Sequence, residues 1–331
     1  MFKNHWLPVL ISLLVLFCIN MLMISSLAPN LFWKQLLAWG IGLILFFIGK
    51  QIDPKQTVST KWIIFVICCV SLLLPIFLNN ITRGSRRWID VGFTTIQPSE
   101  IAKPWLMLFL ANTTLPLIHL LPVGIIMAQP DLGSAISVLF LAVPVILYNK
   151  KLLKITLIGI TVLILLSPLI YNKVLHDYQR HRIINFINPG ADPQGKGYNV
   201  IQSKIAIGSG GFFGKGYKKG SQGQLLFLPE KHTDFMFAAT AEELGCIGIL
   251  IIITSYYFLI KTLFDKAYST QSRPLFIFTL GIALQIWMQA FVNIGMNIGI
   301  LPVTGIPLPF ISVGGSSLMA LLFSLGIVYS S

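Results

Sequence analysis

The sequence predicts an all-α polytopic integral membrane protein, with about ten transmembrane helices and one large extracytoplasmic loop. Three observations predict this class. The chain has 331 residues, of which 55% are hydrophobic and only 11% are charged, and its mean hydropathy is +0.80. A soluble domain carries about 25% charged residues, and disordered chains have low hydrophobicity. The apolar runs are continuous, whereas the strands of a membrane β-barrel alternate apolar and polar residues.

A transmembrane helix needs about 20 mostly apolar residues, and the chain contains a series of apolar runs that approach or reach this length. The predicted helices are 6–27, 32–49, 62–78, 100–111, 115–128, 132–148, 152–171, 234–260, 275–297 and 310–328. The first run is longer than the core of a secretory signal peptide and no small-residue cleavage site follows it, so we expect it to be retained. The runs form one expected membrane domain over 1–331, with one long polar segment at 172–233.

The fourth and fifth runs are short, and only the cluster from Ala111 to Thr114 separates them. They could instead form one bent helix, which would give nine spans. Lysine and arginine gather in cytoplasmic loops, and their placement favours ten spans with both termini in the cytoplasm. The short inside segments then hold Lys3, Lys50, Lys55, Lys61, Lys150, Lys151, Lys154, Lys261, Lys266 and Arg273, against Lys34, Arg83, Arg86 and Arg87 outside. This rule and anionic lipid explain the net charge of +13 without nucleic acid.

The segment 82–104 reads TRGSRRWIDVGFTTIQPSEIAKP, and its arginines are unusual for an outer loop. Arg83, Arg86 and Arg87 cluster beside Trp88. The planar fork of an arginine matches the oxygens of a phosphate or a carboxylate. The alternative is a basic loop that lies against lipid head groups, with Trp88 in the aromatic belt.

The start of the fourth helix carries charges that a membrane span rarely contains. Pro98 and Ser99 are typical of a helix start, and Glu100 and Lys103 share one helix face at i,i+3. They form either a structural ion pair or part of a polar cavity, which the distortion expected at Pro104 favours. Charges inside a span are functional candidates, because one at the bilayer centre costs at least about 2.5 kcal/mol. Asp131 is placed to cap the sixth helix.

The stretch 208–223, GSGGFFGKGYKKGSQG, is rich in glycine and lysine. Glycine-rich turns can cradle a phosphate through backbone N–H groups, although the spacing of a Walker A loop is not met. A mobile loop is the alternative. Upstream, Tyr198, Ile201 and Ile205 have helical spacing and predict a short helix on the membrane surface, with Gln202 and Lys204 on its other faces.

The outer mouth of the eighth helix, LLFLPEKHTDFMFAATAEELG, is crowded with charged and titratable side chains: Glu230, Lys231, His232 and Asp234. Asp234 could cap the helix or act as a general base. Glu242 and Glu243 follow inside the span, where they need polar or cationic partners. Consecutive helical residues point about 100° apart, so at most one of them continues the face of Asp234.

The segment 301–317, LPVTGIPLPFISVGGSS, must break the helical backbone at membrane depth, because it contains three prolines and three glycines. Non-helical backbone at that depth lines a cavity or is buried in protein. Together these residues predict an outward-facing cavity with several cations and carboxylates, suited to an anionic, lipid-linked substrate. The residues themselves leave both an enzyme and a transporter open.

Five ordered blocks resemble the SEDS family (shape, elongation, division and sporulation), from the third span almost to the C-terminus. They are GSRRWIDVGFTTIQPSEIAK, QPDLGSA, YNVIQSKIAIGSGGFFGKG, FLPEKHTDFMFAATAEELG and GILPVTGIPLPFISVGGSSL. The variants RWID, EKHTDF and LPVTGIPLPF are more similar to the rod-shape branch of the family than to its division branch.

The resemblance implies a ten-helix peptidoglycan glycosyltransferase of the bacterial plasma membrane that polymerises lipid II during cell-wall elongation. Its partners would be a class B penicillin-binding transpeptidase and the elongation machinery. Asp234 would be the general base for the acceptor 4-hydroxyl, and undecaprenyl pyrophosphate would leave. Arg87 and Lys103 would bind the pyrophosphate, with Glu100 orienting Lys103 or holding a divalent cation, Mg²⁺ or Mn²⁺, for which Asp234 is a second candidate. The expected substrate-binding residues are Arg87, Trp88, Glu100, Lys103, Asp131, Gln202, Lys204, Lys231, His232 and Glu243.

The sequence departs from the family pattern at two places. The connection between the fourth and fifth spans is nearly absent, and Val313 stands where relatives have tyrosine. Two other functions stay open. A lipid II flippase predicts inverted repeats or paired broken helices, and only the break at 301–317 is visible. A scaffold that recruits the transpeptidase would tolerate the loss of Asp234.

Overall fold

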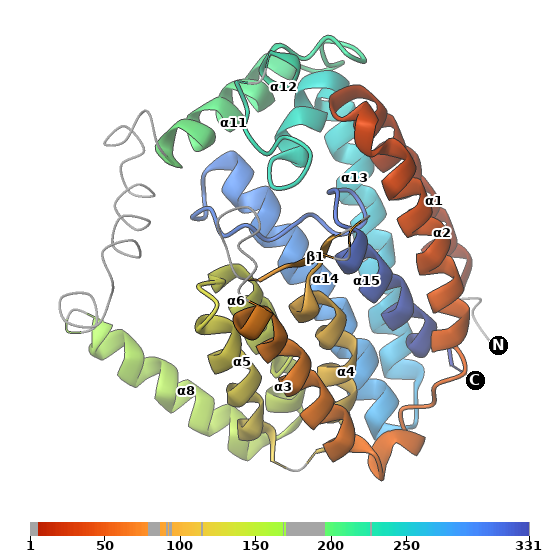
Figure 1. Cartoon of the computed structure of the whole chain (residues 1–331), viewed down its shortest axis with the longest axis vertical. Coiled ribbons are helices and arrows are strands. Elements are labelled where there is room, and N and C mark those ends of the chain that lie inside the picture. Colours follow the sequence, from red (N-terminus) through yellow and green to blue (C-terminus); the bar gives the residue numbers. More distant parts are fainter. Residues whose placement is uncertain are drawn as a thin grey trace. The chain divides into compact units, whose positions relative to one another are not determined.

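The computed structural model describes residues 6–78, 87–90, 92, 95–113, 115–167, 169, 196–225 and 227–330, which are mostly helical (Figure 1). They belong to two compact units. Unit 1 comprises Met1–Val145, Ile252–Ala290 and Ile306–Ser331, and unit 2 comprises Ile146–Ile251 and Phe291–Gly305. The long helices α13 (Met236–Ser269) and α14 (Arg273–Ile298) contribute to both units. The expectation of one domain over 1–331 stays a prediction.

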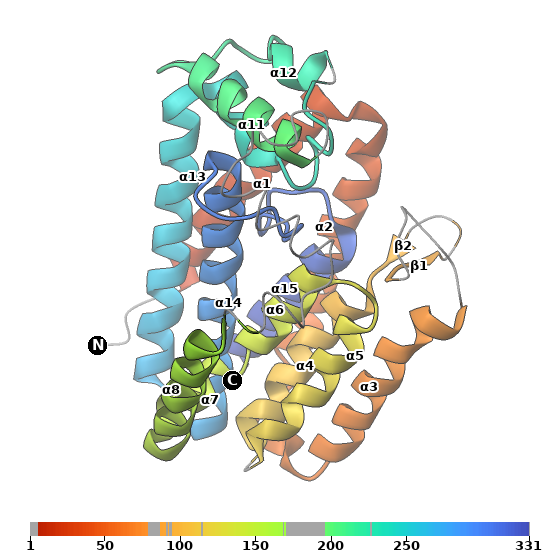
Figure 2. The same cartoon turned by 90° about the vertical axis from the view of Figure 1, so that its left-hand side faces the viewer.

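Unit 1 contains most of the apolar helices. In chain order they are α1 (Trp6–Leu27), η1 (Pro29–Leu31), α2 (Phe32–Gly49), η2 (Gln56–Val58), α3 (Lys61–Leu78), α4 (Pro98–Asn112), η3 (Pro116–His119), α5 (Leu120–Met127), α6 (Leu132–Phe140), the start of α7 (Val143–Tyr148) and α15 (Gly315–Val328). A short antiparallel ribbon of β1 (Ile89–Asp90) and β2 (Thr95–Ile96) lies before α4 (Figure 2). The all-α prediction missed this ribbon, in which Gly92 has a φ of 89°.

Small residues bring α15 close to α2 in unit 1 (Figure 1). A Cβ on Gly49 or on Gly326 would overlap backbone atoms of the facing helix. Such small residues allow the close backbone approach that membrane helices use for packing. The packing buries most of α15 and fixes its first turn, where Ser316 lies.

Unit 2 contains α8 (Lys150–Leu165), α11 (Lys196–Gly210), α12 (Ser221–Gln224) and parts of α13 and α14. The helix predicted around 198–205 is present as α11. Helix α13 is broken at Gly245, which has φ 66° and ψ −162°. The loop after α11 fills the break: the backbone N–H groups of Lys215 and Gly216 donate to the carbonyls of Glu242 and Glu243, at 2.9 and 3.0 Å.

In the part of the chain that the structure describes, the apolar helices follow the order of the predicted spans, and the sixth predicted run, 132–148, forms two helices, α6 and α7. Within the described residues, five segments are long and apolar enough to cross a membrane: α1, Pro29–Gly49, α3, α13 and α14. Shorter apolar segments are Pro116–Met127, Leu132–Tyr148 and Gly315–Val328, and α4 and α8 supply the fourth and seventh predicted runs. The alternative of one bent helix across 100–128 is wrong, because Thr113 is extended and ends α4.

Two predicted boundaries are wrong. The tenth helix was expected from 310 but begins at Gly315, because Phe310 adopts a positive φ of 62° and the turn around it excludes helical bonding. The eighth helix was expected to end at 260 but continues to Ser269. The non-helical backbone predicted for the 301–317 segment is confirmed over 301–314.

Candidate functional site

In unit 1, Arg87 and Asp131 form an ion pair, with 3.1 Å between Nη1 and Oδ1. Asp131 is also the N-cap of α6 and accepts a hydrogen bond from the Ser134 N–H at 3.1 Å, which confirms the predicted cap. The Gln97 side-chain amide donates to Asp131 Oδ2 and to Ser134 Oγ, both at 3.0 Å. Both oxygens of this buried carboxylate therefore have partners, and its Oδ1 anchors Nη1 of the Arg87 guanidinium.

Arg87 retains donors for a ligand. Its side chain is 31% exposed, and its buried Nε has no acceptor among the described residues. An arginine presents five N–H donors, so an anion could bind beside the Asp131 pair. Trp88 is half-buried and follows directly, at the start of the ribbon. Arg83 and Arg86 lie outside the described residues.

Glu100 and Lys103 form the i,i+3 pair that the sequence predicted, with 2.5 Å between Oε1 and Nζ. Both lie near the start of α4, and both are buried; Lys103 is only 2% exposed. Charges taken out of water need their partner, because the remaining charge is costly once the other is removed. The pair therefore holds the Lys103 ammonium in one position.

In unit 2, Asp234 lies two residues before α13, with a half-buried side chain. Its backbone carbonyl accepts hydrogen bonds from the side-chain amides of Asn293 and Asn297, both at 3.0 Å. Gly305, with a φ of 75°, lies beside its carboxylate: a Cβ there would be 3.7 Å from Oδ2. The broken segment predicted at 301–317 thus approaches Asp234 through a glycine.

Glu242 and Glu243 are buried, at 0% and 1% exposure. Glu242 accepts from Lys215 Nζ at 2.6 Å and from Ser221 Oγ at 3.0 Å. It also accepts from the N–H groups of Gln222 and Gly223, at 2.9 and 3.1 Å. The glycine-rich segment does cradle an anion, but in this structure the anion is the chain's own carboxylate.

Glu243 contacts the same segment as Glu242. Its carboxylate accepts from Gln224 Nε2 at 3.0 Å and from the Lys218 N–H at 3.2 Å. Both glutamates therefore have partners in 215–224, as expected of carboxylates within an apolar helix. The substrate contact predicted for Glu243 stays a prediction.

Lys231 connects this segment to the start of α13. Its buried Nζ donates to the Gly223 carbonyl at 2.5 Å. Burial lowers the pKa of the Lys231 amine, and the Glu243 carboxylate opposes that shift. The Gly223 N–H donates to the Glu242 carboxylate, so Gly223 connects Lys231 to Glu242 through two hydrogen bonds.

The remaining predicted binding residues are more accessible. His232 and Gln202 are half-buried and Lys204 is exposed. The Lys204 side chain lies across Gly299, where a Cβ would overlap it. Their role in substrate binding stays a prediction.

Sequence reasoning missed three supporting amides: Gln97, which binds the Asp131 carboxylate, and Asn293 and Asn297, which bind the main-chain carbonyl of Asp234. Asn293 and Asn297 are spaced four residues apart inside an apolar run, so they share one face of α14. Two amides within an apolar span could have predicted a hydrogen-bonding role for this face of α14, because buried polar groups need hydrogen-bond partners.

The described residues contain no group of three or more His, Cys, Asp or Glu side chains that could hold a metal ion. Glu100, one predicted cation ligand, is paired with Lys103, and a divalent cation at this position stays a prediction. The other candidate, Asp234, lies in unit 2.

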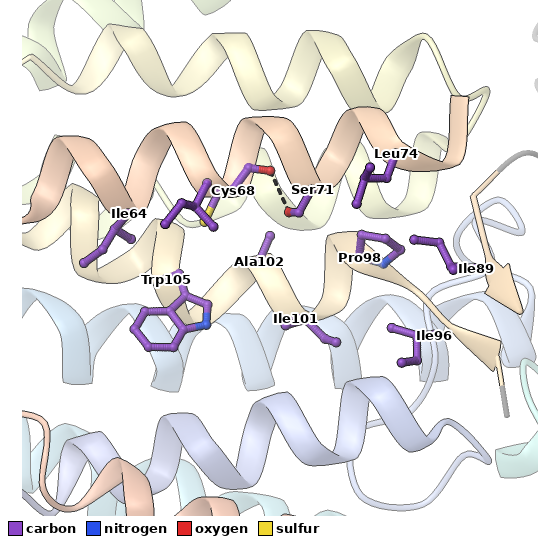
Figure 3. A pocket seen from close by; sticks show the side chains of 11 residues that line it. Ile64, Cys68, Ser71, Leu74, Ile89, Ile96, Pro98, Ile101, Ala102 and Trp105 are labelled. Carbon is purple, nitrogen blue, oxygen red and sulfur yellow. Dashed lines mark hydrogen bonds between the residues drawn. The ribbon is translucent and has the colours of Figure 1, made fainter. Parts of the chain in front are cut away.

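An apolar groove of about 380 Å³ lies between α3, α4 and the ribbon (Figure 3). Ile89 and Ile96 line one end of it, and Ile64 and Trp105 line the other. The one hydroxyl among its lining side chains, Ser71, is bonded to the Cys68 carbonyl at 2.8 Å. The groove therefore suits a hydrocarbon chain.

Comparisons with known proteins agree with this architecture. The chain matches the family model described as cell cycle protein (FtsW, RodA and SpoVE) over residues 2–331. The peptidoglycan glycosyltransferase MrdB of Escherichia coli strain K12 is 40% identical over 309 residues, which cover 88% of this chain and 82% of MrdB.

Two solved structures have the same fold. A chain from a structure described as "Structural coordination of polymerization and crosslinking by a peptidoglycan synthase complex" is 32% identical, with a TM-score of 0.83, covering 97% of this chain and 95% of its own. The rod shape-determining protein RodA of Thermus thermophilus is 28% identical, with a TM-score of 0.70, covering 98% and 97%. The fold is thus a multi-pass helical membrane fold, and the chain belongs to the SEDS family of cell cycle proteins (FtsW, RodA and SpoVE).

Proposed function

We propose that this SEDS-family peptidoglycan glycosyltransferase polymerises lipid II into glycan strands during cell-wall elongation, with Asp234 as the general base. The observation that carries the proposal is the setting of Asp234. Its carboxylate is half-buried at the start of α13, and two buried amides hold its backbone. A general base must be within reach of the substrate and fixed in position, and this setting supports both requirements.

In the proposed reaction, Asp234 takes the proton from the 4-hydroxyl of the acceptor sugar. The hydroxyl oxygen forms a bond to the anomeric carbon of the donor strand. The bond from that carbon to undecaprenyl pyrophosphate breaks on the opposite face, so the carbon is inverted. The pyrophosphate departs with the bonding electrons, and Asp234 later releases its proton to water.

Arg87 is the proposed ligand of the departing pyrophosphate. Its partial exposure, its Nε donor, which has no acceptor among the described residues, and its anchoring by Asp131 support this role. Lys103 would add a positive charge, oriented by Glu100; their 2.5 Å contact favours orientation over cation binding for Glu100. Charge-assisted hydrogen bonds of this kind stabilise negative charge as it develops.

The hydrocarbon tail of the substrate is proposed to lie in the groove between α3 and α4. That groove and Arg87 both belong to unit 1, and Ile89 in the groove's lining is two residues from Arg87. A polyprenyl tail offers only apolar surface, and the lining of the groove is apolar as well.

A class B penicillin-binding transpeptidase is the proposed partner, with the reaction on the outer side of the membrane and both termini in the cytoplasm. A solved relative belongs to a structure described as a synthase complex that couples polymerization with crosslinking. Crosslinking is the chemistry of a transpeptidase, so the same assembly would serve this chain.

Glycan synthesis from labelled lipid II tests the proposal directly. The purified wild type, Asp234→Asn and Asp234→Ala would be assayed with and without a class B transpeptidase. Asp265→Asn is the matched control, because Asp265 is an exposed aspartate further along α13. We expect long strands from the wild type and the control, and none from the two Asp234 variants.

Two results would contradict the proposal. Normal polymerisation by both Asp234 variants would remove Asp234 as the base. Absence of product from the wild type, under conditions where an established polymerase works and the partner is bound, would favour a flippase or a scaffold.

A further inference from the structure

One buried side chain, Asn297, connects three segments of unit 2. Its Nδ2 donates to the Asp234 carbonyl at 3.0 Å, and its Oδ1 accepts from the Ala238 N–H at 3.2 Å. The Ser203 hydroxyl of α11 donates to the Asn297 carbonyl at 2.7 Å. Both Asn297 and Ser203 are fully buried. The side-chain amide of Asn297 therefore joins α14 to the start of α13, and its main-chain carbonyl joins α14 to α11.

The contacts of Asn297 match those of a helix cap. The first backbone bond of α13 runs from the Ala239 N–H to the Phe235 carbonyl, at 3.1 Å, which puts Phe235 at the cap position. A cap side chain normally accepts from the second or third N–H of the helix, and a phenylalanine cannot accept. Ala238 is the third residue of α13, and its N–H finds its acceptor on Asn297 instead.

The same amide also holds the residue before the cap. Asn293, one turn earlier on α14, adds a second bond to the Asp234 carbonyl at 3.0 Å. Only a side chain with both a donor and an acceptor can bind Asp234 and Ala238 together. The position of the Asp234 carboxylate follows from its backbone, and that backbone is fixed relative to α14.

We propose that Asn297 is a positioning residue for Asp234, capping α13 from a neighbouring helix while its Nδ2 holds the Asp234 carbonyl. The inference rests on the proposed role of Asp234 as general base. Inaccurate placement of the Asp234 carboxylate should lower kcat rather than the affinity for substrate. A misplacement of a reacting group by about 1 Å can lower the rate about a hundredfold.

Three variants test the positioning role in the full-length protein. Asn297→Leu removes the contacts with Asp234 and Ala238 and also the Nδ2 bond to the Asn293 carbonyl at 2.8 Å. Asn297→Asp keeps an acceptor for Ala238 and loses the donor to both carbonyls. Gln289→Leu is the control, since it removes another buried amide of α14 that contacts Ser137 instead. We expect kcat to fall about 10- to 100-fold in both Asn297 variants, with KM for lipid II within about twofold and the control near wild type.

A double variant separates action through Asp234 from general damage. If Asn297 acts through Asp234, the residual rate of Asp234→Asn should not fall further when Asn297→Leu is added. A further fall by the same factor as in the wild-type background would overturn the positioning role.

Amide hydrogen exchange gives a readout that does not depend on activity. The Ala238 N–H should exchange about tenfold faster in Asn297→Leu, as for a lost helix cap, and at the wild-type rate in Asn297→Asp and Gln289→Leu. Unchanged exchange in Asn297→Leu would overturn the inference. If the Ala238 N–H exchanges faster in Asn297→Leu but the wild type makes no glycan, the cap is supported and the proposed function is overturned. If Asn297→Leu does not fold, a low kcat in Asn297→Asp with normal exchange supports the positioning role, and a normal kcat overturns it.

Discussion

Lys215 is the counter-ion of Glu242, with 2.6 Å between its Nζ and Oε1. The Glu242 side chain is fully buried, whereas that of Lys215 is 28% exposed. Around this pair, the N–H groups of Gln222 and Gly223 complete the hydrogen bonding of the carboxylate. The pair attaches the glycine-rich segment to α13 just before the break at Gly245.

Removal of the lysine should destabilise the protein because it leaves a buried carboxylate without its cation. For Lys215→Met we expect a loss of about 1–3 kcal/mol, below the 3–5 kcal/mol typical of a fully buried pair, because water partly screens Lys215. Thermal unfolding in detergent measures this loss. Lys219→Met, at an exposed lysine of the same loop, should change stability little.

The double variant Lys215→Met/Glu242→Gln should recover most of that stability, because it removes both charges. A double variant that is as unstable as the sum of the two single variants would show that the ion pair does not account for the effect.

Gly245 should not tolerate a side chain. Its φ of 66° and ψ of −162° lie in a region that only glycine adopts readily. A Cβ there would also overlap backbone atoms of Phe212, Phe213 and Gly214. We therefore expect Gly245→Ala to lower the free energy of unfolding by about 2 kcal/mol or more.

Gly208→Ala is the matched control for this prediction. Gly208 lies in α11 with open space where the Cβ would go, and alanine favours a helix by up to about 1 kcal/mol over glycine. The free energy of unfolding should therefore fall in Gly245→Ala and rise in Gly208→Ala, each relative to the wild type. Equal stability of Gly245→Ala and wild type would mean that the break is not needed for the fold.

The sequence was sufficient for the helices because apolar runs carry that information directly. The capping role of Asp131 and the pairing of Glu100 with Lys103 could also be predicted, since both are local patterns that join residues i and i+3. The tenth helix was misplaced because its true start depends on the turn at Phe310, and no local rule assigns a positive φ to a phenylalanine.

The partners of the Glu242 carboxylate and of the Asp234 main chain could not be predicted from the sequence, because they come from distant parts of the chain. Lys215 and Glu242 are 27 residues apart, and Asn297 is 63 residues from Asp234. Sequence reasoning could place cations near Glu242 in general terms, but it could not choose among Lys215, Lys218 and Lys219. The glycine-rich segment was interpreted as a phosphate cradle because its lysine and backbone N–H groups are suitable donors for an anion. Only the fold shows that the anion they bind is the Glu242 carboxylate.

Asp131 performs two functions that different substitutions can separate. Asn is as good a helix cap as Asp, so Asp131→Asn should retain the start of α6 while it loses the ion pair with Arg87 and the acceptor for the Gln97 amide. Asp131→Ala should lose the cap as well, and we expect it to be less stable than Asp131→Asn by about 1 kcal/mol. Thermal unfolding compares the two. Equal stability would show that the cap contributes little.

The role proposed for Arg87 predicts a loss of donor affinity. Hydrogen bonds to a charged group contribute about 1.5–3 kcal/mol, so Arg87→Ala should raise KM for lipid II at least about tenfold. Arg273→Ala is the control, because Arg273 is an exposed arginine at the start of α14 and is expected on the cytoplasmic side.

Asp131→Asn distinguishes the loss of the guanidinium from the loss of its anchor. It should raise KM less than Arg87→Ala does, because the Arg87 donors remain. Steady-state kinetics at several lipid II concentrations give KM for all three variants. If Arg87→Ala and Arg273→Ala raised KM equally, the arginine would have no special contact with the substrate, and neither the pyrophosphate role of Arg87 nor an outward-facing site would stand.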